Sequence, residues 1–339
     1  MKATIKDIAN EAGVSDTAVS LAFQGNERVG AETKKRIFAA ARKLKYVPNS
    51  AAQNLRSGKT NAVGFIVNDI TNPFYSLMLK EAEEKLNSIG LELFIASSNW
   101  DIDREVKLIE KMIQMRVQGL IICFCEKGTK SIELLNSFSV PHIAVDSYPV
   151  FYKGNFMAND FEVCGRMVAE HLYEIGCRNP GIVNADKRMV EFSAFKKTFA
   201  AFKQYFHEKG IAVKKKNTVE AGLTIDAGKK AVELLKGKSF DADAFFCAND
   251  LCAMGFMEAA EQNGLKIGKD IALVGIDDIP HSSFAKISLT SVRQPYAAIA
   301  CGAAEFISEC IVKGNKRKLK KELKPELIKR NSTYSFSKK

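Results

Sequence analysis

The sequence predicts a small all-α head followed by an α/β body, and three observations support this fold class. Short amphipathic helices fill about the first 45 residues. From residue 62 onward, short apolar strands alternate with amphipathic helices, the pattern of parallel sheets covered on both faces. With 339 residues the chain is also too long for one ordinary domain.

The head has the pattern of a helix-turn-helix. Thr4 followed by Asp7 predicts an N-cap with a capping-box acid for the first helix. Gly13 is expected to end that helix, because glycine accepts positive φ at little cost. Ser15 is expected to cap a second helix, and a third helix is expected over 31–44. Two helices joined by such a turn place the second in the major groove of DNA.

Residues 47–62, "VPNSAAQNLRSGKTNA", start with proline and are rich in alanine. They are typical of a short helical segment that runs into a polar linker. A helix of this length is not stable alone. A flexible tether is the alternative interpretation.

The body is expected to form two similar α/β lobes, because its elements are too many for one such sheet. "LTSVRQP", near 289–295, is typical of a crossing back to the first lobe. The basic run 314–324 is expected to be a solvated turn beside a β-strand, and non-specific attraction of DNA or RNA is the alternative. Strands are predicted in "AVGFIVND", "LELFIAS", "GLIICF", "HIAVDS", "PGIVNA", "AFFCAND" and "IALVGIDD", and helices in "PFYSLMLKEAEEKLNSIG", "REVKLIEKMIQMRV", 162–176, 190–209, 224–236 and 251–263.

Composition and charge narrow the class of function. Residues 1–60 carry 11 Lys/Arg and 5 Asp/Glu, a net charge of +6, whereas residues 61–312 carry 28 and 32, a net charge of −4. A basic head on a mildly acidic body suggests a nucleic-acid partner, and a solvated lysine-rich surface is the alternative. No apolar run is long enough for a membrane span, no secretory signal precedes the head, and the eight cysteines are expected to be reduced. We therefore expect a cytoplasmic protein.

Polar side chains follow several predicted strands of the body. They occur in 68–75, at Asp146 and Asp160, in 249–250 and in 277–278. Ligands of open α/β sheets bind beyond the carboxyl ends of the strands. Any one of these residues is more often structural, but together they predict a ligand cleft. Carboxylates, amides and aromatic rings suit the recognition of a polyol.

The whole chain resembles the LacI/GalR (lactose-repressor) family. The head carries many spaced matches, "TIKDIA…AGVS…AVS…V…ET…RI…A…L.Y.PN..A..LR", and the body resembles the family's periplasmic-binding-protein-like core. The resemblance implies a helix-turn-helix head over 1–47, a hinge helix and linker over 48–61, and an effector-binding and dimerisation domain over 62–339. Lobe one would span about 62–161 and 293–322, and lobe two about 162–292 and 323–339.

The resemblance also implies a DNA-binding role for eleven residues. Leu55 matches the wedge that opens a base step in the minor groove. Asp16, on the exposed face of the second helix, would accept from cytosine N4 or else only stabilise the helix N-terminus. Leu21, expected on the same face, would contact a thymine methyl. Gln53 and Asn54 replace the usual Arg and Ser, so less salt-sensitive contacts are expected. An Arg or His is more usual at position 21, so either a different operator or a greater reliance on hinge and shape readout is expected. The DNA-binding set is Thr4, Ser15, Asp16, Thr17, Ser20, Leu21, Gln24, Asn49, Ala52, Gln53 and Leu55.

Effector-binding residues are implied in the same way. Glu191 stands where the family usually has an effector-binding arginine, and Leu223 stands where an aromatic is common. A glutamate there would disfavour an anionic ligand and tolerate an amine or a neutral polyol. Arg188, one turn earlier, is a possible substitute. The implied effector set is Asn72, Phe74, Asp146, Asp160, Glu191, Leu223, Asn249 and Asp277.

Three classes of function compete at this stage. The first is a DNA-binding transcriptional regulator, acting as a repressor and dimer, that responds to a sugar or polyol or to a partner phosphoprotein. The second is a transport-type sugar-binding protein, which leaves residues 1–60 unexplained. The third is an enzyme, for which no catalytic triad, P-loop or metal-ligand spacing is found. No cofactor is expected.

Overall fold

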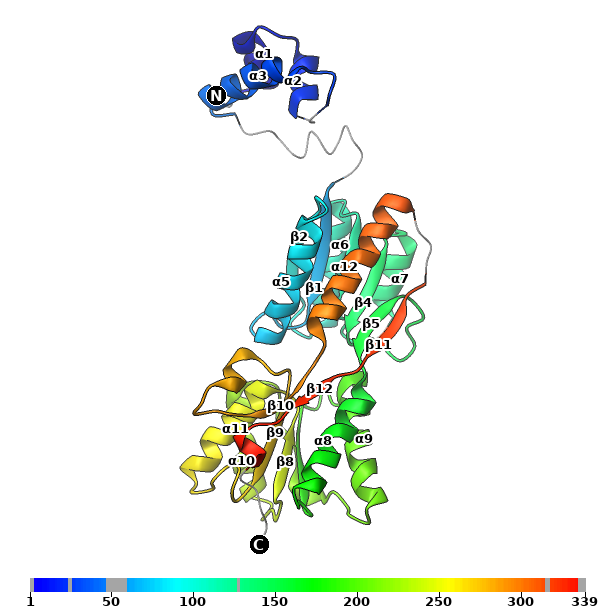
Figure 1. The fold of residues 1–339 in the computed structure, drawn as a ribbon. Coiled ribbons are helices and arrows are strands. Elements are labelled where there is room, and N and C mark those ends of the chain that lie inside the picture. Colours follow the sequence, from blue (N-terminus) through cyan, green and yellow to red (C-terminus); the bar gives the residue numbers. More distant parts are fainter. Residues whose placement is uncertain (1–2, 24–25, 47–59, 127–128, 315–317, 335–339) are drawn as a thin grey trace. The chain divides into compact units, whose positions relative to one another are not determined.

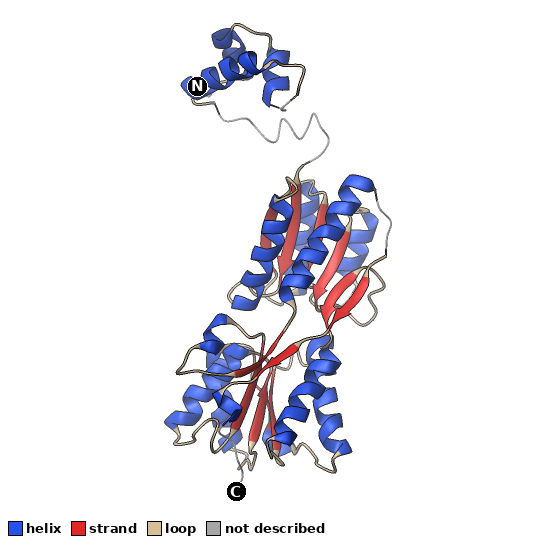
Figure 2. Cartoon of the chain, viewed as in Figure 1, coloured by secondary structure: helices blue, strands red, loops and turns tan. Residues whose placement is uncertain are grey.

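The computed structural model describes residues 3–23, 26–46, 60–126, 129–314 and 318–334. The chain forms two compact units, which comprise residues 1–60 and 61–339. The first unit contains the helical head and the second contains two α/β lobes (Figures 1 and 2). The expected fold class, a helix-turn-helix head before two α/β lobes, is confirmed.

The head contains three helices, α1 (Ile5–Ala12), α2 (Asp16–Phe23) and α3 (Ala31–Lys43). The capping box is present, because the Thr4 hydroxyl accepts from the Asp7 N–H and the Thr4 N–H donates to the Asp7 carboxylate. Gly13 ends α1 at φ 64°. The Ala18 N–H donates to the Ser15 hydroxyl at 3.2 Å, as expected of a helix cap.

A small apolar core joins the three head helices. Ile8, Val19 and Ile37, one from each helix, are fully buried. Phe23 stacks edge-on against Phe38 at 5.4 Å between ring centroids. These contacts explain why a head this small keeps its helices together.

The first lobe is built on a six-stranded sheet in the order β11-β5-β4-β3-β1-β2, and all neighbouring strands are parallel. The basic run 314–324 was expected to be a solvated turn, but its residues 320–323 pair with β5 as an edge strand. The strands are β1 (Ala62–Val67), β2 (Glu92–Ser97), β3 (Gly119–Ile122), β4 (His142–Asp146), β5 (Phe156–Asn159) and β11 (Lys320–Leu323).

Helices cover both faces of this sheet. In β1, Val63 and Phe65 pack into the core under α5 and α12, whereas Ala62 and Ile66 pack into the core under α6 and α7. This alternation is the two-residue period of a strand buried on both faces. The sequence analysis did not predict α7 or α12. The four helices are α5 (Pro73–Asn87), α6 (Ile102–Gln114), α7 (Lys130–Ser137) and α12 (Tyr296–Lys313).

The second lobe contains another six-stranded sheet, in the order β12-β10-β9-β8-β6-β7. Its neighbours are parallel except β12, which runs antiparallel to β10. The strands are β6 (Pro180–Asn184), β7 (Thr218–Glu220), β8 (Ala244–Cys247), β9 (Ala272–Ile276), β10 (Thr290–Arg293) and β12 (Glu326–Ile328).

Helices α8 (Phe161–Glu174) and α9 (Ser193–Glu208) cover one face of the second sheet, and α10 (Ile225–Lys236) and α11 (Asp250–Gln262) cover the other. Short helices η1 (Lys215–Asn217), η2 (Pro280–Ser283) and α13 (Asn331–Tyr334) complete this lobe. Figure 2 shows the two helical layers on either side of the strands.

The chain passes between the lobes after β5, after β10 and after β11 (Figure 1). Arg293 belongs to the second sheet and Leu323 to the first, each one residue beyond the expected boundary. Strand pairing explains the difference, since Arg293 pairs with Glu326 and Leu323 pairs with Asn159.

Candidate functional site

A pocket lies between the two lobes, at the carboxyl ends of both sheets. It contains about 530 Å³ of space free of atoms, part of it open to solvent. Both lobes contribute side chains to its wall. The lining residues are Asn72, Phe74, Tyr75, Trp100, Asp146, Ser147, Phe161, Phe192, Ala194, Phe195, Thr198, Leu223, Ala248, Asn249, Ile276, Asp277 and Gln294.

Most of the expected effector residues line this pocket. The end of β4 and the segments that follow β1, β8 and β9 each bring at least one of them to the cleft, because the carboxyl ends of parallel strands meet at one edge of a sheet. The residues concerned are Asn72, Phe74, Asp146, Leu223, Asn249 and Asp277.

The structure does not bring Asp160 or Glu191 to the pocket. Asp160 caps α8 by accepting the Val163 N–H at 3.0 Å. The Glu191 side chain is 76% exposed and pairs with Lys196 at 2.8 Å. The pattern match put Glu191 in the cleft, but the turn before α9 directs it to solvent.

Arg188, the possible substitute for the missing arginine, is also a surface residue. Its side chain is 80% exposed, and its guanidinium pairs with Asp186 at 2.9 Å. Neither Arg188 nor Asp186 lines the pocket.

The sequence analysis missed several aromatic residues of the pocket. Trp100 follows β2 and contacts Phe192 and Phe195, with ring centroids 5.8 and 6.4 Å apart. Trp100 belongs to the first lobe and the two phenylalanines belong to the second, so these rings meet across the cleft. The strand-end argument would have found Trp100 had it been applied to β2. Phe192 precedes α9, and no strand-end signal marks it.

Asp277 joins the lobes by hydrogen bonds from neutral donors. Asn72 of the first lobe donates to it at 3.2 Å, and Gln294 donates at 2.8 Å. Its backbone has φ 112°, which is uncommon for a residue other than glycine. Burial raises the pKa of Asp277 well above its ordinary value, and the nearby carboxylate of Asp250 adds to this effect.

Asp146 faces the same pocket from the end of β4. The Tyr75 hydroxyl donates to its carboxylate at 3.1 Å. Burial raises the pKa of Asp146 to about 7, and the hydrogen bond from Tyr75 only partly opposes this. Burial also raises the pKa of Tyr75 well above its usual range.

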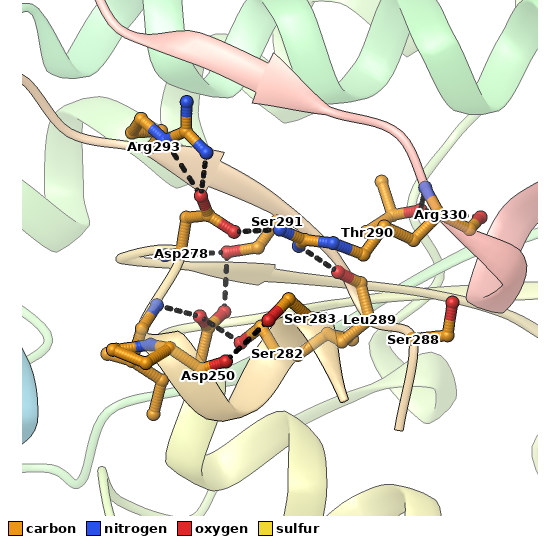
Figure 3. A network of polar contacts seen from close by, with 12 residues as sticks. Asp250, Asp278, Ser282, Ser283, Ser288, Leu289, Thr290, Ser291, Arg293 and Arg330 are labelled. Atoms are coloured by element: carbon orange, nitrogen blue, oxygen red, sulfur yellow. Dashed lines mark hydrogen bonds and ion pairs between the residues drawn. The ribbon is translucent and has the colours of Figure 1, made fainter. Parts of the chain in front are cut away.

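A polar network holds the loop that carries Asp277 (Figure 3). Asp250, fully buried at the start of α11, accepts the Ile279 N–H at 2.9 Å and the hydroxyls of Ser282 and Ser291 at 2.7 and 2.5 Å. Ser291 in turn accepts the Asp278 N–H at 3.0 Å. The network therefore ties α11, β10 and the loop after β9 together.

The lobes meet again beside the pocket. The Ser193 N–H, at the start of α9 in the second lobe, donates to the Glu126 carboxylate of the first lobe at 2.7 Å. Burial raises the pKa of Glu126 to about 7. At the edge of the cleft Lys197 of α9 pairs with Glu322 of β11 at 3.3 Å. Polar contacts therefore join the lobes on more than one side.

The head presents the residues expected to bind DNA at the start of α2. Ser15, Asp16 and Thr17 are exposed, and Ser20 is half-buried. Leu21 is half-buried against the head core, which corrects the expectation that it lies fully on the exposed face.

Thr4 uses its hydroxyl in the capping box. The remaining expected DNA-binding residues and most of the hinge segment 48–61 lie outside the described residues. These expected residues are Gln24, Asn49, Ala52, Gln53 and Leu55.

In the part of the chain that the structure describes, no cluster of three His, Cys, Asp or Glu side chains has the arrangement of a metal site. Within the same residues, no helix combines the length and apolar character needed to cross a membrane.

Together the fold and site define a helix-turn-helix protein with a periplasmic-binding-protein-like body. A family model described as "Bacterial regulatory proteins, lacI family" matches residues 4–49, and one described as "Periplasmic binding protein-like domain" matches residues 169–333. The chain therefore combines a lacI-family DNA-binding domain with a periplasmic-binding-protein-like domain.

Relatives along the full length agree with this assignment. The HTH-type transcriptional repressor PurR of Pasteurella multocida is 27% identical over 334 residues, which cover 98% of this chain and 99% of the relative. The PurR of Aliivibrio salmonicida is 26% identical over 98% of this chain and 100% of the relative. These relatives are named as transcriptional repressors, in agreement with the expectation that the chain is not an enzyme.

Solved structures show the same fold. The Lac repressor dimer bound to operator and the anti-inducer ONPF matches with a TM-score of 0.86 and 23% identity, over 98% of this chain and 99% of that one. The transcriptional regulator CelR in complex with cellobiose matches with a TM-score of 0.73 and 22% identity, over 97% and 99%.

Proposed function

We propose that this protein is a sequence-specific DNA-binding transcriptional repressor whose affinity for its operator is controlled by a small molecule in the inter-lobe pocket. One observation carries the proposal: in a chain with a lacI-family head, a pocket between the lobes is lined by side chains of both lobes. A ligand that contacts both lobes favours one arrangement of them, and so has the differential affinity that regulation requires.

The proposed effector is a sugar or related polyol. Carboxylates, amides and a hydroxyl line the pocket beside several aromatic rings, and this mixture suits hydroxyl groups and the faces of sugar rings. The CelR structure, which contains cellobiose, supports the chemical class in a protein of the same fold.

The proposed assembly is a homodimer that works in the bacterial cytoplasm and associates with the nucleoid when bound to DNA. The matching Lac repressor structure is a dimer on its operator, which supports this assembly. The proposed domains are a head over 1–47, a hinge helix and linker over 48–61 and an effector and dimerisation domain over 62–339. Leu55 is proposed as the minor-groove wedge, and the exposed start of α2 as the reader of base edges.

The first prediction tests DNA binding itself. Selection from a randomised duplex library is expected to yield a near-palindromic site, because a two-fold dimer reads two half-sites. The logarithm of the affinity should fall linearly with the logarithm of salt concentration, since phosphate contacts release counterions. Fluorescence anisotropy at several salt concentrations and sedimentation of the complex measure both properties.

Two outcomes would count against the proposal. The first is a selection that enriches no sequence, which would favour a transport-type binding protein. The second is a monomer that binds one half-site at full affinity, which would contradict the proposed homodimer. A repressor that binds its operator but responds to no small molecule would favour control by a partner phosphoprotein.

The second prediction concerns Leu55. Leu55→Ala should weaken specific operator binding by about 1–3 kcal/mol, because the wedge that supports a kinked duplex is lost. Leu234→Ala, at a 39% exposed leucine of α10, is the matched control and should bind as the wild type does. Equal operator affinity of the Leu55 variant and the wild type would exclude the wedge role.

A further inference from the structure

The inter-lobe pocket contains two buried carboxylates that no basic side chain neutralises. Asp146 and Asp277 are 7% and 5% exposed, and both line the pocket. Among the described residues, no Lys, Arg or His lines it, and no ion pair reaches either carboxylate. Their hydrogen-bond donors are a phenol and two amides, which carry no charge.

The neighbouring residue Asp278 does not line the pocket, and basic side chains compensate its charge. The Asp278 carboxylate lies 2.7 Å from the guanidinium of Arg293 and 2.7 Å from that of Arg330 (Figure 3). Asp277, one residue earlier, faces the pocket and has neither partner. Arginine side chains therefore compensate the charge of Asp278, whereas Asp277, which faces the pocket, has no such partner.

Burying a carboxylate without a counter-charge is costly, so a second group usually compensates it. Amide and hydroxyl donors recover only part of the lost hydration. A positive charge carried by the ligand would recover more, because charge-assisted hydrogen bonds are about twice as strong as neutral ones. An anionic ligand would instead meet two carboxyl groups in a pocket that no cationic side chain lines among the described residues.

Aromatic rings strengthen this preference for a cation. Trp100, Phe192 and Phe195 meet across the cleft in the pocket wall, and Tyr75 lies beside Asp146. Aromatic faces attract cations and also pack against the apolar face of a sugar ring. A ligand that carries both an ammonium group and a hydroxylated carbon skeleton matches all parts of this wall.

We propose that the effector of this pocket is a protonated amine that carries several hydroxyl groups, an amino sugar or amino polyol, whose ammonium group binds the Asp146 and Asp277 carboxylates. This inference rests on the proposed function, since it names the class of effector. It replaces the earlier argument from Glu191, because that side chain faces solvent. The preference for a cation instead follows from the two pocket carboxylates.

The test compares probes that differ in charge and little else. The amines are D-glucosamine, D-galactosamine, D-mannosamine and 1-amino-1-deoxy-D-glucitol. Each is paired with its neutral parent, D-glucose, D-galactose, D-mannose or D-glucitol, and with its N-acetyl derivative. D-glucosamine 6-phosphate tests the effect of a negative charge. Thermal shift of the full-length protein at pH 7 ranks the probes, and calorimetry measures the affinities.

At least one amine is expected to raise the melting temperature and to bind at least tenfold more tightly than both its neutral parent and its N-acetyl derivative. The phosphorylated amine should bind more weakly than the amine itself. Three results would each overturn the inference: no amine shifts the melting temperature, a neutral parent binds as tightly as its amine, or the phosphate ester binds more tightly.

A variant of Asp146 then tests whether its carboxylate binds the ammonium group of the ligand. Asp146→Asn is expected to lower the affinity for the best amine about 10- to 100-fold and the affinity for its neutral parent less than threefold. Asparagine suits this position because Asp146 has φ 64°. Glu162→Gln, at an exposed carboxylate next to pocket-lining Phe161, is the matched control and should bind both probes normally. Equal losses for amine and parent in Asp146→Asn would contradict the assignment, and the wild-type panel decides the question if that variant does not fold.

Operator binding in the presence of each probe separates this inference from the proposed function. A neutral sugar that binds and changes operator affinity would support the proposed regulatory function and overturn the inference that the effector is an amine. An amine that binds selectively without changing operator affinity would support the preference of the pocket for an amine and overturn the regulatory role of this ligand.

Discussion

Replacing Asp250 by alanine is expected to lower the free energy of unfolding by about 2–4 kcal/mol at pH 7. The substitution leaves three buried donors, the N–H of Ile279 and the hydroxyls of Ser282 and Ser291, without their acceptor (Figure 3). Each unsatisfied buried donor costs about 1–3 kcal/mol, although a hydroxyl can turn to another acceptor and a backbone N–H cannot. Removing the buried carboxyl offsets part of the loss.

The decrease in the free energy of unfolding caused by Asp250→Ala should also depend on pH. Burial raises the pKa of Asp250 to about 7 from an ordinary 3.8. Between these two values the folded protein holds the proton more tightly than the unfolded chain does, so this carboxyl makes the wild type less stable as pH rises from about 4 to 7. Alanine has no such dependence, and the difference in stability between wild type and variant should therefore be larger at pH 5 than at pH 8.

Urea unfolding at pH 5 and pH 8, followed by circular dichroism, measures both effects. Ser283→Ala is the matched control, because Ser283 is exposed beside the network and bonds only the Pro280 carbonyl in the part of the chain described. Glu105, whose pKa burial raises to about 7, is present in both proteins and cancels in the difference. A loss below 1 kcal/mol, or a loss that is larger at pH 8, would refute this account of Asp250.

Replacing Asp277 by alanine is expected to suppress the response of operator binding to the effector and to preserve operator binding without it. The variant removes the acceptor of ligand hydrogen bonds, and a bond to a charged group contributes about 1.5–3 kcal/mol, or roughly 10- to 150-fold in affinity. The cross-lobe bond from Asn72 is lost as well. The effector then has a smaller difference in affinity between the two arrangements of the lobes, and it shifts operator binding less.

Operator titration with and without the most stabilising probe of the ligand panel measures this coupling. Asp277→Asn serves as a second variant, because asparagine tolerates the positive φ of this residue better than alanine does. Asp226→Ala, at an exposed residue of α10, is the control for loss of a carboxylate on the same lobe. An Asp277→Ala protein that still responds at the wild-type effector concentration would place the ligand elsewhere and favour a partner protein as the regulator.

Local sequence was sufficient to predict the head and most elements of the body. Caps such as Thr4 and Ser15 act on backbone groups only three residues away, so their role follows from spacing alone. The alternation of strands and helices is equally local, and it was enough to predict two parallel-sheet lobes. Helix α12 was missed, and β11 was expected to be a solvated turn. The pairing of β11 with β5 joins segments more than 160 residues apart in the sequence, which local periodicity does not report.

The pocket was predictable where a strand end places a residue. Asn72, Asp146, Asn249 and Asp277 follow strands of parallel sheets, whose carboxyl ends all open to one edge. The same rule failed for Asp160, because a polar residue before a helix can also serve as its cap. Whether such a residue lines the pocket or caps the helix depends on the direction of its side chain, and residue type does not reveal that direction.

The electrostatic character of the pocket, by contrast, was decided by tertiary structure alone. Sequence shows that no arginine stands at the usual position, but Glu191 and Arg188 turn out to face solvent, while Trp100 and Phe192 meet across the cleft from different lobes. Charge compensation depends on distances of a few ångströms between residues far apart in the chain. The packing of the lobes therefore sets the charge of this pocket, by leaving Asp146 and Asp277 buried and two guanidiniums on Asp278.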